Sequence, residues 1–137
     1  MTDAGQLRDL MPFAVKLGIE IDEATPKAVR GRLAWAPELC TTAGVMHGGA
    51  LISLADSLGG VCAFLNLPEG AGTATVSSTT NMMRAVREGE VRAETRSLHV
   101  GRTVIVVQTD LRDDQDRLVA QVTQTQAVLP AAAGASE

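Results

Sequence analysis

The sequence predicts a single α+β domain in which one long helix packs on an antiparallel sheet of about six strands. The 137 residues are enough for one hydrophobic core but too few for two domains. One apolar segment, residues 48–66, repeats with helical spacing, and the segments on either side of it alternate apolar and polar residues. The predicted order is two strands, the helix and four further strands, and this order is typical of the α+β class. We expect the domain to span residues 1–129.

The N-terminal region is predicted to contain a short amphipathic helix over residues 4–11, which Pro12 ends. A first strand follows, because apolar residues then alternate with polar ones at Val15, Leu17, Ile19 and Ile21. Residues 22–26 form a turn, and a second strand over residues 29–35 returns as a hairpin. We expect a loop from residue 37 to residue 46.

The predicted helix of residues 48–66 carries two stripes of side chains. The first stripe is apolar and consists of Leu51, Leu54, Leu58, Val61 and Leu65. The second combines small residues with a carboxylate and consists of Ile52, Asp56, Gly59, Gly60 and Ala63. Each glycine inside a helix costs on the order of 1 kcal/mol relative to alanine. We therefore expect another helix or a substrate to approach Gly59 and Gly60 closely.

Four strands are predicted after the helix, over residues 73–84, 91–97, 104–109 and 118–129. Turns separate them at Glu88-Gly89, at Gly101-Arg102 and at Asp113–Asp116. The tail, residues 130–137, is expected to be disordered. A sheet of this size has open edges, and this favours oligomers.

The composition excludes several classes of function. A net charge of -4 without a basic cluster argues against nucleic acid as a partner. The polar, acidic start is unlike a signal peptide, and no segment reaches the length of a membrane span. Cys40 and Cys62 lack CxxC spacing, so we expect free thiols and a cytoplasmic location. The two histidines and two cysteines have no metal-ligand spacing, so no metal is expected.

The start of the long helix carries the residues that can support chemistry. Gly48 and Gly49 follow His47 and can leave backbone N–H groups bare at the positive end of the helix dipole. Asp56 lies in an otherwise apolar stretch, where a buried carboxylate is costly unless it is paired or used. Donors at a helix start and a perturbed carboxylate suit attack on a thioester or ester carbonyl. The alternatives are a tight loop at the glycines, a helix-entry role for His47, and an aspartate bonded to Ser53 or Ser57.

Three segments resemble the hotdog-fold acyl-CoA thioesterases of the phenylacetate-degradation and 4-hydroxybenzoyl-CoA types. They are Gly44-Val45-Met46-His47-Gly48-Gly49 with Leu54-Ala55-Asp56, the segment Asn81–Glu90, and Val100-Gly101-Arg102. The resemblance covers residues 17–129 and implies a long central helix wrapped by the sheet. It also implies acyl-CoA hydrolysis without a cofactor, since coenzyme A is part of the substrate.

The resemblance assigns roles to residues of this motif. Asp56 matches the catalytic acid, and the backbone N–H groups of Gly48 and Gly49 match those that polarise the thioester oxygen. His47 matches the histidine that shapes the loop. Thr41 stands where the family usually has Asn or Gln, so Thr41 or Thr42 is the candidate to replace that amide. Whether Asp56 activates water or attacks the carbonyl directly stays open.

Helix geometry predicts an active site shared between two chains. Nine residues advance a helix by about 13 Å and rotate it by about half a turn, so Asp56 is badly placed to serve its own chain's glycines. An antiparallel partner helix would bring the second chain's Asp56 there. The family resemblance implies the same dimer, usually paired further into tetramers.

Substrate contacts are predicted more broadly. Arg84, Arg87 and Arg102 are candidates for the phosphates of coenzyme A, or they are solvated surface charges. Ser77, Ser78 and Thr79 could line the pantetheine path, and Gly60 could admit the substrate. The acyl group is expected to be an aryl or medium aliphatic chain. The alternative function is a non-catalytic acyl-CoA-binding protein.

Overall fold

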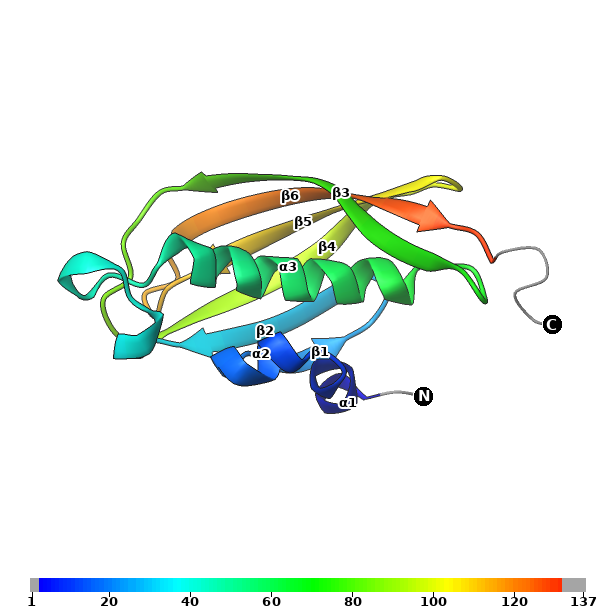
Figure 1. Ribbon diagram of the computed structural model, residues 1–137. Helices are drawn as coiled ribbons and strands as arrows, with labels where there is room; N and C mark the ends of the chain where they lie inside the picture. The colour runs from blue at the N-terminus through cyan, green and yellow to red at the C-terminus, as the bar shows by residue number, and fades with distance from the viewer. Residues whose placement is uncertain (1–2, 132–137) are drawn as a thin grey trace.

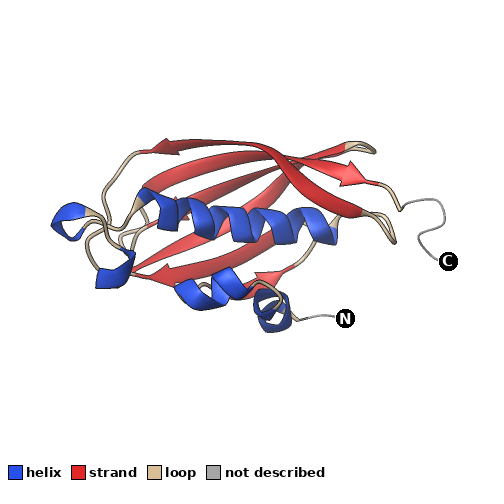
Figure 2. Cartoon of the chain, in the orientation of Figure 1, coloured by secondary structure: helices blue, strands red, loops and turns tan. Residues whose placement is uncertain are grey.

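The computed structural model describes residues 3–131. Three α-helices, two short 3-10 turns and six strands follow one another along the chain (Figures 1 and 2). The helices are α1 (Ala4–Asp9), α2 (Pro12–Leu17) and α3 (Gly48–Leu65), and the 3-10 turns are Pro37–Leu39 and Thr42–Gly44. The strands are β1 (Glu20–Ala24), β2 (Ala28–Ala34), β3 (Gly72–Met82), β4 (Glu90–Val100), β5 (Val104–Arg112) and β6 (Leu118–Leu129).

All six strands belong to one antiparallel sheet with the order β1-β2-β4-β5-β6-β3. The sheet curves around α3, and the helix contacts every strand (Figure 1). The predicted α+β class, with one long helix on a six-stranded antiparallel sheet, is confirmed. β3 joins the sheet at its edge beside β6, although it directly follows α3 in the sequence.

The core lies between α3 and the concave face of the sheet. The helix contributes the apolar stripe predicted from its spacing, of which Leu51, Leu54, Leu58 and Val61 are buried. Alternate residues of the strands complete it, most deeply on β5, where Ile105, Val107 and Leu111 are fully enclosed. The period of two along β5 and β6 therefore separates a core face from a solvent face.

The prediction for the N-terminus was wrong in two respects. The helix expected over residues 4–11 is α1, which already ends at Asp9, and Pro12 begins a second helix that was not predicted. Proline is favourable at a first helical position because its missing N–H has no intrahelical partner there. The apparent alternation from Val15 is part of α2, which ends at Gly18 with a φ of 86°. The first strand therefore begins at Glu20, and Val15 is 45% exposed.

The other predicted boundaries differ by a few residues. α3 ends at Leu65 with Asn66 as its C-cap. β3 ends at Met82 instead of Arg84, while β4 and β5 extend to Val100 and Arg112 because Gly101 makes the tight connection between them. The prediction for the tail concerns residues 130–137, of which residues 132–137 lie outside the described part of the chain.

The expectation that no segment reaches the length of a membrane span was wrong for α3 by length and composition. This helix has 18 residues and is apolar enough to cross a membrane. Half of it is buried inside the fold, against the sheet. Its apolar character is therefore accounted for by its position in the core of the domain.

Candidate active site

The loop before α3 is held by backbone hydrogen bonds that fix the start of the helix. Met46 donates its N–H to the carbonyl of Val86 at 2.8 Å, and His47 donates its N–H to the carbonyl of Leu39 at 2.8 Å. The side chain of His47 caps the helix, because its Nδ1 accepts the N–H of Gly49 at 2.8 Å. A neutral His47 therefore carries its proton on Nε2.

This capping bond separates the roles of the two glycines. The N–H of Gly49 is occupied by His47, so it is not the bare donor that the sequence predicted. The N–H of Gly48 comes before the first helical hydrogen bond, and no hydrogen bond among residues 3–131 uses it. Gly48 is thus the donor of this pair without a hydrogen bond in the described part of the chain, at the positive end of the α3 dipole.

Asp56 lies on the outer face of α3 and is exposed in the single chain. The expectation of a carboxylate buried within the chain was therefore wrong. Neither serine binds it, because Ser53 donates its hydroxyl to the carbonyl of Gly49 at 2.7 Å and Ser57 donates to the carbonyl of Ser53 at 2.8 Å. Its partner is Gln124 of β6, whose Nε2 donates to Oδ1 of Asp56 at 2.7 Å. Sequence reasoning missed Gln124, whose only signal was a glutamine at a core-facing position of a strand.

Gly48 and Asp56 are separated along the helix by eight residues, which correspond to about 12 Å. The predicted rotation of half a turn relative to Asp56 applies to His47, which precedes Asp56 by nine residues. It does not apply to Gly49, which lies on the same exposed face of α3 as Asp56. Two different hollows adjoin that face. His47, Gly49 and Ser53 line one of about 310 Å³, and Asp56 and Gly60 line another of about 330 Å³.

The two helix glycines have different neighbours. A Cβ built on Gly59 would lie 1.7 Å from Oε1 of Gln124, so Gly59 faces the sheet and makes room for that side chain. A Cβ built on Gly60 meets no atom within 4 Å. The prediction that another helix or a substrate approaches both glycines is thus wrong for Gly59, whereas Gly60 lines the hollow beside Asp56.

The hollow beside Asp56 has further lining residues that sequence reasoning did not select. They come from α2, from its N-cap residue Met11 and from the β3–β6 pair, and they include Phe13, Thr75 and Gln126. The buried Gln126 donates its Nε2 to the hydroxyl of Thr75 at 2.8 Å. Phe13 also lines the hollow beside His47 and so stands between the two.

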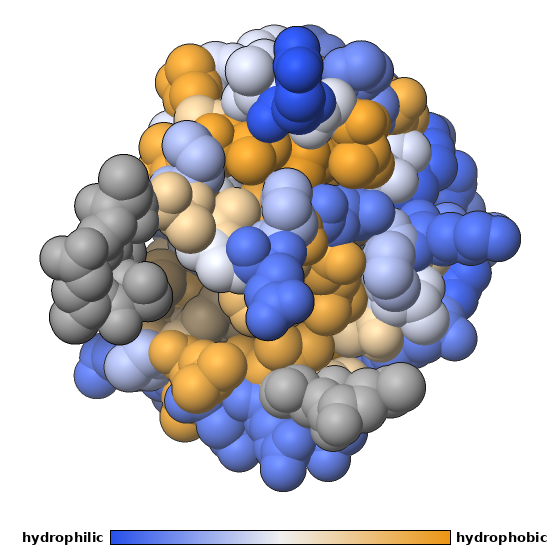
Figure 3. All heavy atoms as spheres, turned by 90° about the vertical axis from the view of Figure 1, so that its right-hand side faces the viewer, coloured by the Kyte–Doolittle hydropathy of each residue, from blue (hydrophilic) through white to orange (hydrophobic). Residues whose placement is uncertain are grey.

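An apolar hollow of about 170 Å³ continues from the Asp56 hollow, since Met11 and Gly60 line both. Its other lining residues are Leu7, Leu10, Val61 and Phe64. Leu10 and Phe64 are 72% and 53% exposed. Figure 3, which looks onto the end of the molecule where α3 ends, shows hydrophobic atoms gathered over this end.

Thr41 lies in the loop before α3 and is exposed. Its N–H donates to the carbonyl of Val45 at 2.8 Å, which closes the turn around Thr42–Gly44. Thr41 does not line the His47 hollow, where its neighbours Glu38, Leu39 and Cys40 do. Met82 approaches the helix start instead, because its Cε would lie 3.0 Å from a Cβ on Gly48.

The predicted coenzyme A contacts are spread over the domain. Ser77, Ser78 and Thr79 are exposed on the edge strand β3. Arg84 and Arg87 are exposed in the β3–β4 connection, at the end of the sheet where α3 begins (Figure 1). Arg102 lies in the β4–β5 turn at the opposite end of the sheet. Within one chain the structure does not bring Arg102 together with the other two arginines.

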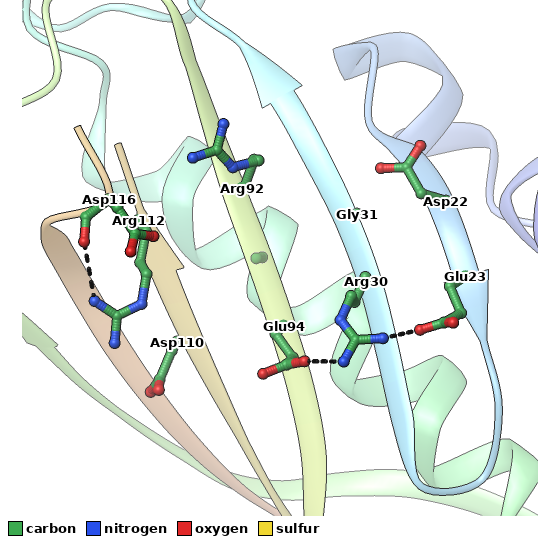
Figure 4. A pocket seen from close by; sticks show the side chains of 10 residues that line it. Asp22, Glu23, Arg30, Gly31, Arg92, Glu94, Asp110, Arg112 and Asp116 are labelled. Atoms are coloured by element: carbon green, nitrogen blue, oxygen red, sulfur yellow. Dashed lines mark hydrogen bonds and ion pairs between the residues drawn. The ribbon is translucent and has the colours of Figure 1, made fainter. Parts of the chain in front are cut away.

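A further hollow, of about 540 Å³, lies on the other face of the sheet and is lined mainly by charged residues (Figure 4). Arg30 lies between Glu23 and Glu94 and pairs with both. Arg112 donates to the backbone carbonyl of Asp116 at 3.2 Å. The walls of this hollow are therefore formed by solvated cross-strand ion pairs, on the face of the sheet away from α3.

No group of three or more His, Cys, Asp or Glu side chains in the described part of the chain could hold a metal ion. Both cysteines are free. Burial raises the pKa of Cys62 to about 11, so this thiol stays protonated at neutral pH.

Comparisons with known proteins identify the family. The model of the thioesterase superfamily matches residues 43–120, more than half of the chain, from the loop before α3 into β6. A Mycobacterium tuberculosis protein named as an esterase is 32% identical over 114 residues, which are 81% of each chain. The 1,4-dihydroxy-2-naphthoyl-CoA hydrolase of Escherichia coli is 34% identical over 86 residues, which are 63% of each chain.

Solved structures agree over almost the whole chain. A thioesterase from Haemophilus influenzae superimposes with a TM-score of 0.88 at 26% identity and covers 97% of this chain and 98% of its own. The structure of the Mycobacterium tuberculosis esterase relative gives a TM-score of 0.86 at 31% identity and covers 90% of this chain and 100% of its own. The chain therefore belongs to the thioesterase superfamily and is a hotdog-fold thioester hydrolase.

Proposed function

We propose that the protein hydrolyses an aryl-acyl or medium-chain acyl-CoA to the free acid and coenzyme A, with Asp56 as the catalytic carboxylate. The observation that carries this proposal is the exposed Asp56 carboxylate, held by one hydrogen bond at the mouth of a hollow that continues into an apolar one. The naphthoyl-CoA hydrolase among the relatives supports a bulky aromatic acyl group as one candidate.

The acyl oxygen accepts the N–H of Gly48, where negative charge develops as the carbonyl is attacked. One lost donor of this kind typically costs about 2.7–4 kcal/mol of transition-state stabilisation. The Asp56 carboxylate either takes a proton from the attacking water or attacks the carbonyl itself to form an anhydride that water then opens. In both routes the C–S bond breaks and the coenzyme A sulfur leaves with a proton.

We further propose that the active unit is a homodimer in which Gly48 of one chain works with Asp56 of the other. The separation of about 12 Å along one helix is too long for both groups to reach one carbonyl. β3 supports the dimer, because this edge strand of eleven residues carries neither a charge nor a proline and is exposed almost throughout. Edges of this kind invite pairing with another strand. Further association of two dimers and a cytoplasmic location, which the free cysteines favour, belong to the same proposal.

The first experiment measures thiol release from a panel of acyl-CoA thioesters with the wild type and Asp56→Asn. The panel contains 1,4-dihydroxy-2-naphthoyl-, phenylacetyl-, benzoyl- and 4-hydroxybenzoyl-CoA and straight chains of increasing length. We expect turnover of at least one thioester and a loss of about 100-fold or more in the variant, the range expected when a general acid or base is removed. Full activity of Asp56→Asn would exclude the assigned carboxylate.

A mixing experiment tests whether the site is shared. Gly48→Pro removes the amide donor and Asp56→Asn removes the carboxylate, so each variant alone is expected to keep about 1% of the wild-type activity or less. When the two are unfolded and refolded together, about half of the dimers are mixed, and each mixed dimer has one complete site if the site spans two chains. Recovery of about a quarter of the wild-type activity supports a shared site, and no recovery contradicts it.

A further inference from the structure

We propose that Gln124 is a positioning residue that fixes the orientation of the Asp56 carboxylate, and that Gly59 exists to make room for it. This inference rests on the proposed role of Asp56. Gln124 lies on the inner face of β6 and is 1% exposed. It does not line the hollow beside Asp56, so it acts on the substrate only through that carboxylate.

The orientation of the Gln124 amide follows from the chemistry of its partner. An ionised carboxylate can only accept hydrogen bonds, so Nε2 must face Asp56 and Oε1 must face the core. The bond between Nε2 and Oδ1 is 2.7 Å long, and no ion pair within residues 3–131 involves Asp56. One carboxylate oxygen is thus held from below, which leaves the other free for water or the thioester carbon.

This arrangement leaves Oε1 of Gln124 without a hydrogen bond. It is the one buried side-chain oxygen or nitrogen in the described part of the chain that lacks a partner. The other buried glutamine of β6, Gln126, uses both ends of its amide, since Thr73 donates to Oε1 and Nε2 donates to Thr75. An unpaired buried polar atom destabilises a fold, and proteins tolerate such defects mainly where function requires them.

Gly59 adds a second destabilising feature at the same point. A Cβ on Gly59 would lie 1.7 Å from Oε1 and 2.9 Å from Cδ of Gln124, so any larger residue would displace the amide. Glycine inside a helix is itself unfavourable. Two unfavourable features, a glycine inside a helix and a buried oxygen without a partner, therefore lie in contact with each other. Both concern the Gln124 side chain, whose one hydrogen bond goes to Asp56. We infer that the protein loses stability at this point in exchange for a correctly oriented Asp56 carboxylate.

The test compares kcat, KM and Tm of Gln124→Met with those of the wild type on the thioester that turns over fastest. Methionine has similar length but cannot donate to Asp56. We expect kcat to fall by about 10- to 100-fold, as when a reacting group loses its alignment, with KM within about threefold. Tm is expected to equal or exceed that of the wild type, because the unpaired oxygen is gone. Gly59→Ala should break the same hydrogen bond, because its Cβ displaces the Gln124 amide, and it is likewise expected to reduce kcat.

Gln108→Met is the matched control. Gln108 lies on the outer face of the sheet, where it accepts a hydrogen bond from Arg96 and donates one to Thr123. The substitution is therefore expected to leave kcat unchanged. Wild-type kcat in Gln124→Met, or a loss carried by KM alone, overturns the inference. Asp56→Asn, measured in parallel, distinguishes a failure of the positioning role of Gln124 from a failure of the catalytic role of Asp56. If it is inactive while Gln124→Met is fully active, only the positioning role fails, whereas an active Asp56→Asn removes the role of Asp56 and this inference with it.

Discussion

Replacing Gly48 by proline tests the proposed amide donor with little change to the fold. Proline lacks the N–H but suits the first position of a helix, where its fixed φ is already helical. The preceding residue must be extended, and His47 is extended, with a ψ of 137° that lies within the range that a following proline allows. α3 should therefore form normally in Gly48→Pro.

The magnitude follows from the number of donors lost. The capping bond between His47 and Gly49 already occupies the second amide, so Gly48→Pro removes the one N–H of the pair that has no hydrogen bond among the described residues. The loss of a single donor to a developing oxyanion is typically worth about 2.7–4 kcal/mol, or about 100- to 1,000-fold in kcat. We expect kcat to fall within this range.

The assay is thiol release under saturating substrate, and the comparison is between Gly48→Pro and Gly48→Ala. Both add a Cβ, which would lie 3.0 Å from Cε of the half-exposed and flexible Met82. The ratio between the two variants therefore removes the steric effect of the Cβ from the comparison. Circular dichroism and Tm establish that both variants are folded. If Gly48→Pro hydrolyses the thioester within about threefold of Gly48→Ala, Gly48 does not supply the donor, and the reasoning from the helix start is refuted.

Three further predictions concern other parts of the domain. Gly60→Leu fills the open space beside Asp56, so kcat/KM should fall more for long and aromatic acyl groups than for acetyl-CoA, and an equal loss for all would place the acyl group elsewhere. Hydrogen bonds from Arg117 and Gln115 lower the pKa of Asp113 below 3.8, so its stabilising effect is present above that pH and is lost as the pH falls through the lowered value. The Tm gap between wild type and Asp113→Asn should accordingly be larger at pH 7 than at pH 2, and a constant gap would contradict this. Because Cys62 is buried with a raised pKa, a disulfide reagent at pH 8 should modify Cys40 alone in the native protein and both cysteines after unfolding, as counted by mass spectrometry.

Much of the fold was determined locally and could be predicted. The apolar stripe of α3 and the alternation along β4, β5 and β6 arise from the 3.6-residue and two-residue periods of side-chain direction, so they can be recognised in the sequence. The same rule failed at Val15, because a few alternating residues fit a helix as well as a strand. Pro12 was equally ambiguous, since proline both ends one helix and begins another.

The sequence by itself determined the family and the residues at the helix start, because His47, Gly48, Gly49 and Asp56 belong to one continuous segment with a recognisable spacing. Only the tertiary structure decided how they are used. The capping bond from Gly49 to His47 depends on a side-chain rotamer, and the contact between Asp56 and Gln124 joins residues 68 positions apart. Whether Asp56 is buried, and why Gly59 is glycine, depend on which strand packs against which face of α3. Such contacts depend on packing in three dimensions, which cannot be predicted from the periodicity of side chains along the sequence.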